Sequence, residues 1–187
     1  MNIKNLGAHY PPAKQALETR RDERQAALAA GSTDPRVAQD LVALNNSLGQ
    51  EDKNLTLFDS LPAGSKSRSV VLAMMTDQLL KSRRYQDVIP DGGAQAAFQK
   101  AADRYTAMMN SMGNSPAKAQ MEEHFRDYTT RQGTKYFEAL AGLKRDQDAK
   151  DLAAQILKFD SSATTRESLA EAAQRAQNTD LAQYLKQ

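Results

Sequence analysis

The sequence predicts an all-α protein: a right-handed stack of antiparallel helical hairpins with one extra N-terminal helix. Apolar residues recur every three or four positions, and no stretch shows the period-two alternation of a strand. At four places a helical pattern ends in a short polar turn and another pattern starts at once. Leu48 and Leu80 are 32 residues apart, as are Arg145 and Gln177. A helix–turn–helix unit that recurs at this spacing is typical of a stacked helical array.

The composition favours helices and excludes several kinds of chemistry. Hydrophobic residues make up 40% of the chain and aromatic residues 6%, so the core must be built mainly from Ala, Leu, Val and Met. The 25 basic and 23 acidic residues are well mixed, and a net charge of +2 is too small to indicate nucleic acid by itself. The absence of Cys excludes disulfides, thiolate catalysis and Cys-based zinc sites.

Residues 1–33 are predicted to form a polar lead-in and one helix. The composition of residues 13–30 is helical, and Gly31 ends the pattern. Because its apolar positions are few and small, this helix is expected to be half exposed or to dock on another surface. No window has the ~20 apolar residues of a membrane span, and the first residues have no hydrophobic signal core. The Ala- and Gln-rich style suggests a bacterial protein, either in the periplasm, after removal of a signal peptide, or in the cytoplasm.

Residues 34–187 are predicted to form a single array of hairpins that open near residues 34, 65, 94, 132 and 163. Asp34-Pro35 is a helix opening, because Asp can cap free N–H groups and Pro fits the first turn. The segment 90–93 (Pro-Asp-Gly-Gly) is the strongest turn signal in the chain and marks a possible joint between two halves.

Three finer features are predicted in the second half of the array. Ser115-Pro116 is expected to open a helix in the same way as Asp34-Pro35. Gly133 is expected to end that helix, or nearly so. Thr164 and Glu167 have the spacing of a capping box at the start of the last hairpin.

Residues 48–59 (Leu-Gly-Gln-Glu-Asp-Lys-Asn-Leu-Thr-Leu-Phe-Asp) resemble the middle of a tetratricopeptide repeat. Gly49 and Phe58 match the turn glycine and the later aromatic of that family, and Ala149 and Ala182 stand where its small residue belongs. The resemblance covers residues 34–89 and 132–187 best. It departs at Asn54, which occupies the small position. It departs again at residue 177, where Gln replaces the usual Gly and would be strained if the turn needs positive φ.

The resemblance implies a protein–protein interaction scaffold with a concave groove lined by the first helix of each hairpin. Arginines in such a groove could pair with carboxylates of a partner. Adjacent methionines, as in Met74-Met75 and Met108-Met109, cannot face the same way on a helix, so one of each pair is expected to be exposed. By this analogy the groove candidates are Arg36, Gln39, Asn46, Arg68, Met75 and Arg131.

The sequence therefore predicts non-catalytic binding of a protein or peptide, with no enzyme activity, cofactor, metal or small-molecule substrate. Three alternatives stay open. The clusters Arg20-Arg21, Arg24 and Arg83-Arg84 could bind nucleic acid. His124, with neighbouring carboxylates at 122, 123 and 127, could serve a metal site or a helical enzyme. Helix 13–30 could mediate self-association.

Overall fold

The computed structural model is all-helical, as predicted. It describes residues 10–113 and 118–186, of which 79% lie in ten α-helices and none in a β-strand. The chain divides into two compact units, residues 1–77 and 78–187, and the division falls within α5 (Lys66–Lys81). We call them the N-terminal unit and the C-terminal unit. Most of the predicted lead-in, and the predicted opening at Ser115-Pro116, lie outside the described residues.

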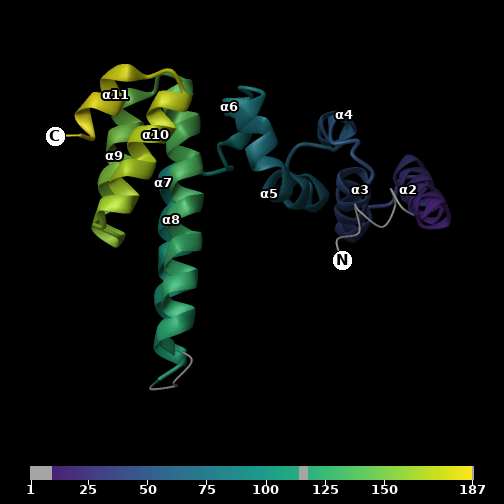
Figure 1. Cartoon of the computed structure of the whole chain (residues 1–187), viewed down its shortest axis with the longest axis horizontal. Coiled ribbons are helices and arrows are strands. Elements are labelled where there is room, and N and C mark those ends of the chain that lie inside the picture. The colour runs from purple at the N-terminus through teal and green to yellow at the C-terminus, as the bar shows by residue number, and fades with distance from the viewer. Residues whose placement is uncertain (1–9, 114–117, 187) are drawn as a thin grey trace. The chain divides into compact units, whose positions relative to one another are not determined.

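The N-terminal unit contains α2 (Pro11–Ala29), α3 (Pro35–Ser47), α4 (Asp52–Ser60) and most of α5 (Figure 1). α2 has no buried residue, which confirms that this helix is largely exposed. It packs against α3, where Arg24 Nε lies 3.0 Å from Asp40 Oδ2. The predicted cap at Asp34 is confirmed, because its side chain accepts a hydrogen bond of 2.9 Å from the N–H of Arg36.

Apolar side chains from α3, α4 and α5 form the core of the N-terminal unit. The guanidinium of Arg68 joins α5 to the end of α4. Its Cζ lies 3.8 Å from the ring centroid of Phe58, and its Nη1 donates to the carbonyl oxygens of Phe58 (2.6 Å) and Leu61 (3.2 Å). These bonds satisfy carbonyl groups that the end of a helix leaves free. The buried side chains of this core are Val37, Ala38, Leu41, Val42, Leu44, Leu57, Phe58, Leu61, Val71 and Met75.

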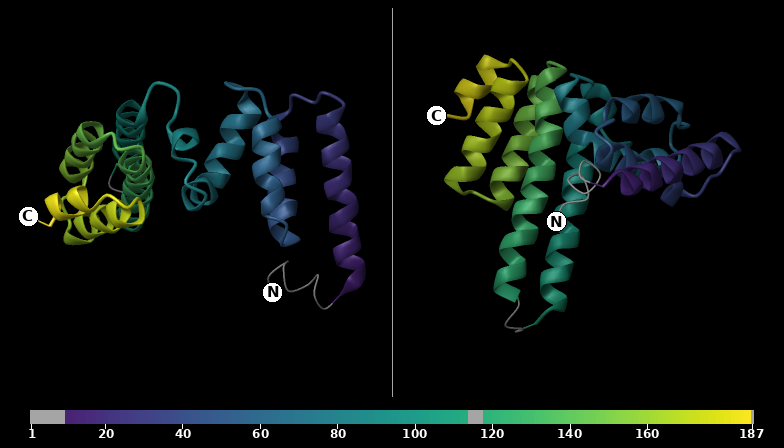
Figure 2. Two further views of the ribbon diagram at one scale, coloured as in Figure 1. Left: turned by 90° about the horizontal axis from the view of Figure 1, so that it is seen from above. Right: turned by 45° about the vertical axis from the view of Figure 1, so that its right-hand side comes forward.

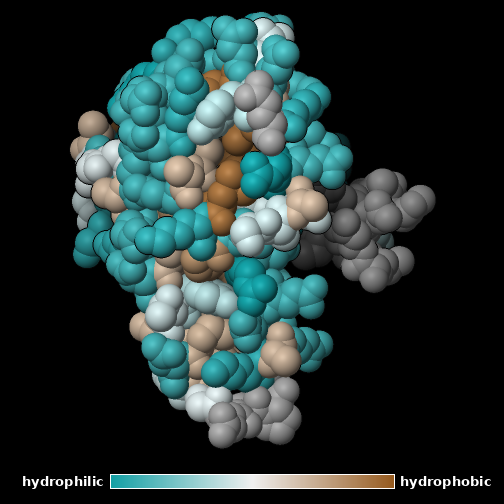
Figure 3. Space-filling view, turned by 90° about the vertical axis from the view of Figure 1, so that its left-hand side faces the viewer, coloured by the Kyte–Doolittle hydropathy of each residue, from teal (hydrophilic) through white to brown (hydrophobic). Residues whose placement is uncertain are grey.

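The C-terminal unit continues through α6 (Tyr85–Val88), α7 (Ala94–Ser111), α8 (Lys118–Gly142), α9 (Asp146–Phe159), α10 (Ala163–Arg175) and α11 (Thr179–Tyr184). α7 and α8 lie side by side as an antiparallel pair, and α9, α10 and α11 cover one end of it (Figure 2). Seventeen buried residues form one core here, centred on Phe137, Leu140 and Ile156. The view in Figure 3 shows a mostly hydrophilic surface with a narrow apolar strip.

The predicted break at Gly133, and with it a separate hairpin opening near residue 132, is wrong. α8 runs without interruption for 25 residues. A Cβ placed on Gly133 would lie 2.7 Å from Cδ2 of Phe98 and 2.9 Å from Cδ1 of Ile156. The glycine therefore serves the close packing of α7 and α9 against α8, and the helical interactions outweigh its propensity cost of about 1 kcal/mol.

The predicted capping box at Thr164 and Glu167 is also wrong, because α10 starts two residues earlier than that motif requires. Its cap is Ser162, whose Oγ accepts a bond of 3.2 Å from the N–H of Thr165. The Thr165 hydroxyl donates to Asp160 Oδ2 at 2.6 Å. Burial alone would raise the pKa of Asp160, but these hydrogen bonds from Thr165 and Ser162 outweigh it and lower the pKa below its ordinary value of 3.8.

Four helices end in the same left-handed turn. Gly49, Arg83, Lys144 and Gln177 have φ values of 69°, 55°, 59° and 56°. In each turn this residue donates its N–H to the carbonyl three residues earlier. The following residue donates to the carbonyl five residues earlier, and all eight distances fall between 2.8 and 3.3 Å. This is the Schellman motif. The requirement for positive φ at Gln177 is thus confirmed, and three of the four turns meet it without glycine.

Candidate functional site

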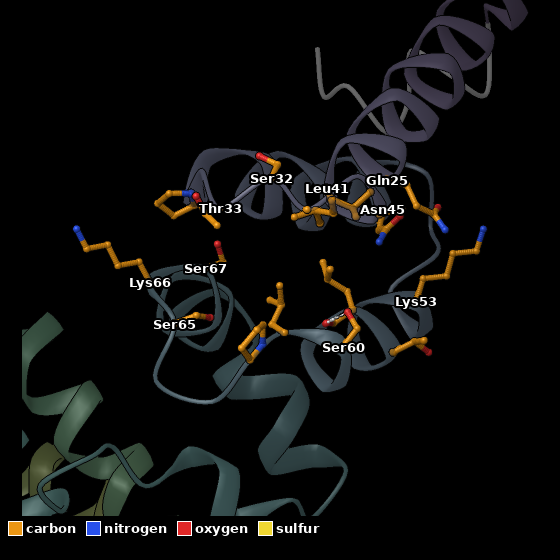
Figure 4. A pocket seen from close by; sticks show the side chains of 18 residues that line it. Gln25, Ser32, Thr33, Leu41, Asn45, Lys53, Ser60, Ser65, Lys66 and Ser67 are labelled. Carbon is orange, nitrogen blue, oxygen red and sulfur yellow. Dashed lines mark hydrogen bonds between the residues drawn. The ribbon is translucent and has the colours of Figure 1, made fainter.

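The N-terminal unit contains a pocket with a volume of about 1000 Å³. All four of its helices contribute, together with the turns between α2 and α3 and between α4 and α5 (Figure 4). Leucine side chains from α2, α3, α4 and the following turn supply much of the apolar wall. They are Leu28, Leu41, Leu57 and Leu61, of which the last three also belong to the core.

A pair of buried amides joins α3 to α4 at one wall of this pocket. Asn45 Nδ2 donates to Asn54 Oδ1 at 2.9 Å, and Asn54 Nδ2 donates to Asn46 Oδ1 at 2.7 Å. Asn54, which departs from the tetratricopeptide pattern, is therefore a bridge between the helices. Asn45 lines the pocket and is only 2% exposed, yet its Oδ1 has no hydrogen-bond partner among the described residues. An unsatisfied buried acceptor costs about 1–3 kcal/mol, which a bound N–H group would relieve.

Polar groups lie along the whole length of the pocket. In Figure 4, Ser32, Thr33 and Ser67 lie toward the end marked by Lys66, and Gln25 and Asn45 lie toward the end marked by Lys53. The pocket thus combines apolar walls with hydrogen-bonding groups at several points, as ligand pockets usually do.

A smaller pocket, of about 340 Å³, lies at the start of α3. It is lined by Arg24, Asp34, Arg36, Val37, Gln39 and Asp40. Its charges already serve the protein: Arg24 pairs with Asp40, and Asp34 caps α3. This pocket therefore offers less unsatisfied chemistry than the larger one.

The predicted groove residues are spread over several environments. Only Arg36 and Gln39 come together, in the smaller pocket, and none of the six lines the larger one. Asn46 is bonded to Asn54, and Arg68 is stacked on Phe58. Arg131 belongs to the C-terminal unit and pairs with Asp127 at 2.7 Å.

Met75 is 1% exposed in the core, whereas its neighbour Met74 is 39% exposed. The expectation that one methionine of this pair is exposed is confirmed, but the exposed one is Met74. In the second pair, Met109 is buried and Met108 is half-buried.

The arginines of the nucleic-acid alternative have partners within the protein. Arg21 Nη1 donates to Gln50 Oε1 at 2.7 Å, and Arg24 pairs with Asp40. Arg83 donates to Gln177 at 3.1 Å, and Arg84 pairs with Asp87 at 2.7 Å. No group of three or more metal-ligating side chains occurs in residues 10–113 and 118–186.

Sequence reasoning missed the residues that line the larger pocket. Leu41 and Leu57 fit the apolar stripes of α3 and α4, so nothing in their spacing separates a pocket wall from a core. The available signal was Asn54, a polar residue at a position where the helices are expected to touch.

Comparisons of the chain with family models, curated proteins and solved structures find no match. Within the described part of the chain, no helix has both the length and the hydropathy needed to cross a membrane.

Proposed function

We propose that the chain is a non-catalytic scaffold that binds a segment of another protein in the larger pocket of the N-terminal unit. The observation that carries this proposal is the pocket itself, whose wall holds the unsatisfied acceptor Asn45 Oδ1. Its volume of about 1000 Å³ is at the upper end of the range for ligand pockets, about 300–1,000 Å³.

The chemistry of the lining favours an extended peptide. Apolar side chains of the peptide would contact Leu28, Leu41 and Leu57, and such burial contributes about 25 cal/mol per Å². Each peptide residue also brings an N–H and a C=O that need partners. The polar groups spread along the pocket, from Ser67 to Gln25, suit this requirement better than a cluster at one end would.

The arrangement of the hairpins is proposed to be tetratricopeptide-like. Gly49 and Arg83, the left-handed residues of the first two such turns, are 34 residues apart, and Lys144 and Gln177 are 33 apart. A tetratricopeptide repeat has 34 residues. This recurrence supports the family proposal, whereas the uninterrupted α8 is a departure from a regular array.

The test is selection of peptides from a random displayed library on the full chain, followed by affinity measurements with the synthetic peptides. Ala29 is exposed and lines the pocket, so Ala29→Trp should fill it and weaken binding at least tenfold. Ala26→Trp is the matched control, since Ala26 is exposed on the same helix but is not part of the lining. Circular dichroism checks that both variants fold.

Two results would overturn the proposal. One is a library that yields no saturable binder of the wild-type chain. The other is a set of peptides that bind the Ala29→Trp variant as tightly as the wild type.

A further inference from the structure

We infer that the peptide bound by the larger pocket is apolar in its middle and acidic at both ends. This inference rests on the proposed function and specifies the chemistry of its partner. It starts from the charges of the pocket, whose 18 lining residues include two lysines and no Asp or Glu.

The two lysines lie at opposite ends of the pocket. Lys66, at the start of α5, marks one end, and Lys53, in the first turn of α4, marks the other (Figure 4). Both are exposed, and neither has an ion-pair partner among the described residues. Long lysine stems can lie along apolar surface while the ammonium groups stay in water, where they can meet carboxylates of a partner.

Two neighbouring carboxylates of the protein are engaged elsewhere. Asp34 accepts the N–H of Arg36 at the cap of α3, and Asp40 pairs with Arg24. The positive charge at the two ends is therefore left for the ligand to balance. A ligand with basic ends would meet like charges there, and such repulsion is a common source of specificity.

Between the lysines, two of the hydroxyl groups are already used by the protein. Ser60 Oγ donates to the carbonyl of Leu57 at 2.7 Å, and Ser65 Oγ accepts the N–H of Arg68 at 3.1 Å. Together with Leu41 and Leu61, these satisfied groups leave the middle of the pocket suited to apolar side chains. Asn45 Oδ1 can accept one main-chain N–H of the peptide.

The test uses two matched pools of short synthetic peptides on the full chain. Both pools have the same mixture of Leu, Ile, Val and Phe in the middle, and they differ only in Glu or Lys at both ends. We expect the Glu-flanked pool to bind at least tenfold tighter in low salt. Lys53→Gln and Lys66→Gln should each weaken it roughly two- to fivefold, as expected for exposed ion pairs. Lys81→Gln is the control, because Lys81 is an exposed lysine of α5 outside the pocket.

The outcomes separate this inference from the proposed function. If both pools bind equally and both are lost in Ala29→Trp, acidic selectivity is overturned while peptide binding stands. If neither pool binds, or if Ala29→Trp changes nothing, both are overturned. Tighter binding of the Lys-flanked pool contradicts the inference directly.

Discussion

The C-terminal unit packs its apolar side chains into one continuous core, whereas the N-terminal unit leaves a pocket of about 1000 Å³ among similar side chains. The difference lies in the residues at the helix contacts. In the C-terminal unit, Gly133 and Gly142 sit where a Cβ would collide with aromatic rings, so the helix backbones come close. In the N-terminal unit, the Asn45–Asn54 hydrogen bond joins α3 to α4 instead. Small residues close a core, and a bridge of larger polar residues is compatible with an open space beside it.

The turns show a second contrast. The N-terminal unit uses Gly49 in its left-handed turn between α3 and α4, whereas the C-terminal unit uses Arg83, Lys144 and Gln177 at the same kind of position. Lys144 Nζ donates to the carbonyl of Gln177 at 2.9 Å, and Arg83 donates to its side chain. Side-chain bonds between two of these turns thus offset part of the cost of a left-handed non-glycine residue.

The largest expected effect comes from shortening a leucine in each unit. Leu140→Ala removes a fully buried side chain from the closed core and should cost about 4 kcal/mol. Leu41→Ala should cost about 2 kcal/mol, because Leu41 already borders a pocket and has fewer neighbours to lose. Urea unfolding of the full chain measures both values. Equal losses would mean that the pocket is not an open space in solution.

Next in size is the close approach around α8. Gly133→Ala should destabilise the chain by about 2 kcal/mol, since the new methyl group collides with Phe98 and Ile156. Thermal unfolding compares this variant with Ala154→Gly, a change at an exposed position of α9 that costs about 1 kcal/mol from helix propensity alone. A stabilised Gly133→Ala variant would contradict the proposed packing role of the glycine.

The turn contrast predicts opposite signs for two substitutions. Gln177→Gly should stabilise the chain by about 1 kcal/mol because it relieves the left-handed conformation, and Gly49→Ala should destabilise it by a similar amount. Denaturant midpoints measured on both variants test this. A loss of stability in Gln177→Gly would show that the bonds to Gln177 outweigh the backbone strain.

The smallest effect concerns pH. Because hydrogen bonds lower the pKa of Asp160 in the folded chain, its contribution to stability is present above the ordinary value of 3.8. The contribution is lost as the pH falls through the lower pKa of the folded state. Asp160→Asn should therefore be less stable than the wild type at neutral pH, and the gap should close in acid. A gap that is constant with pH would exclude this role for the carboxylate.

Sequence reasoning predicted the helices, the cap at Asp34 and the turns well, because these depend on local spacing and backbone requirements. It failed at Gly133, where a tertiary contact decides the outcome and a glycine in a helix carries no local sign of it. It also placed Met75 on a surface, although only the packing of the helices decides which of two adjacent methionines is buried. The pocket could not be predicted, because Leu41 has the same periodicity whether it faces a core or an open space.

The most direct test of the proposed binding site is an NMR titration of the ¹⁵N-labelled full chain with the Glu-flanked peptide pool. We predict shifts of the amide signals of residues at the pocket, such as Leu28, Leu41, Lys53 and Ser67, with those of the C-terminal core left in place. Shifts that concentrate on α8 and α9, or none at saturating peptide, would contradict the assignment of the pocket as the binding site.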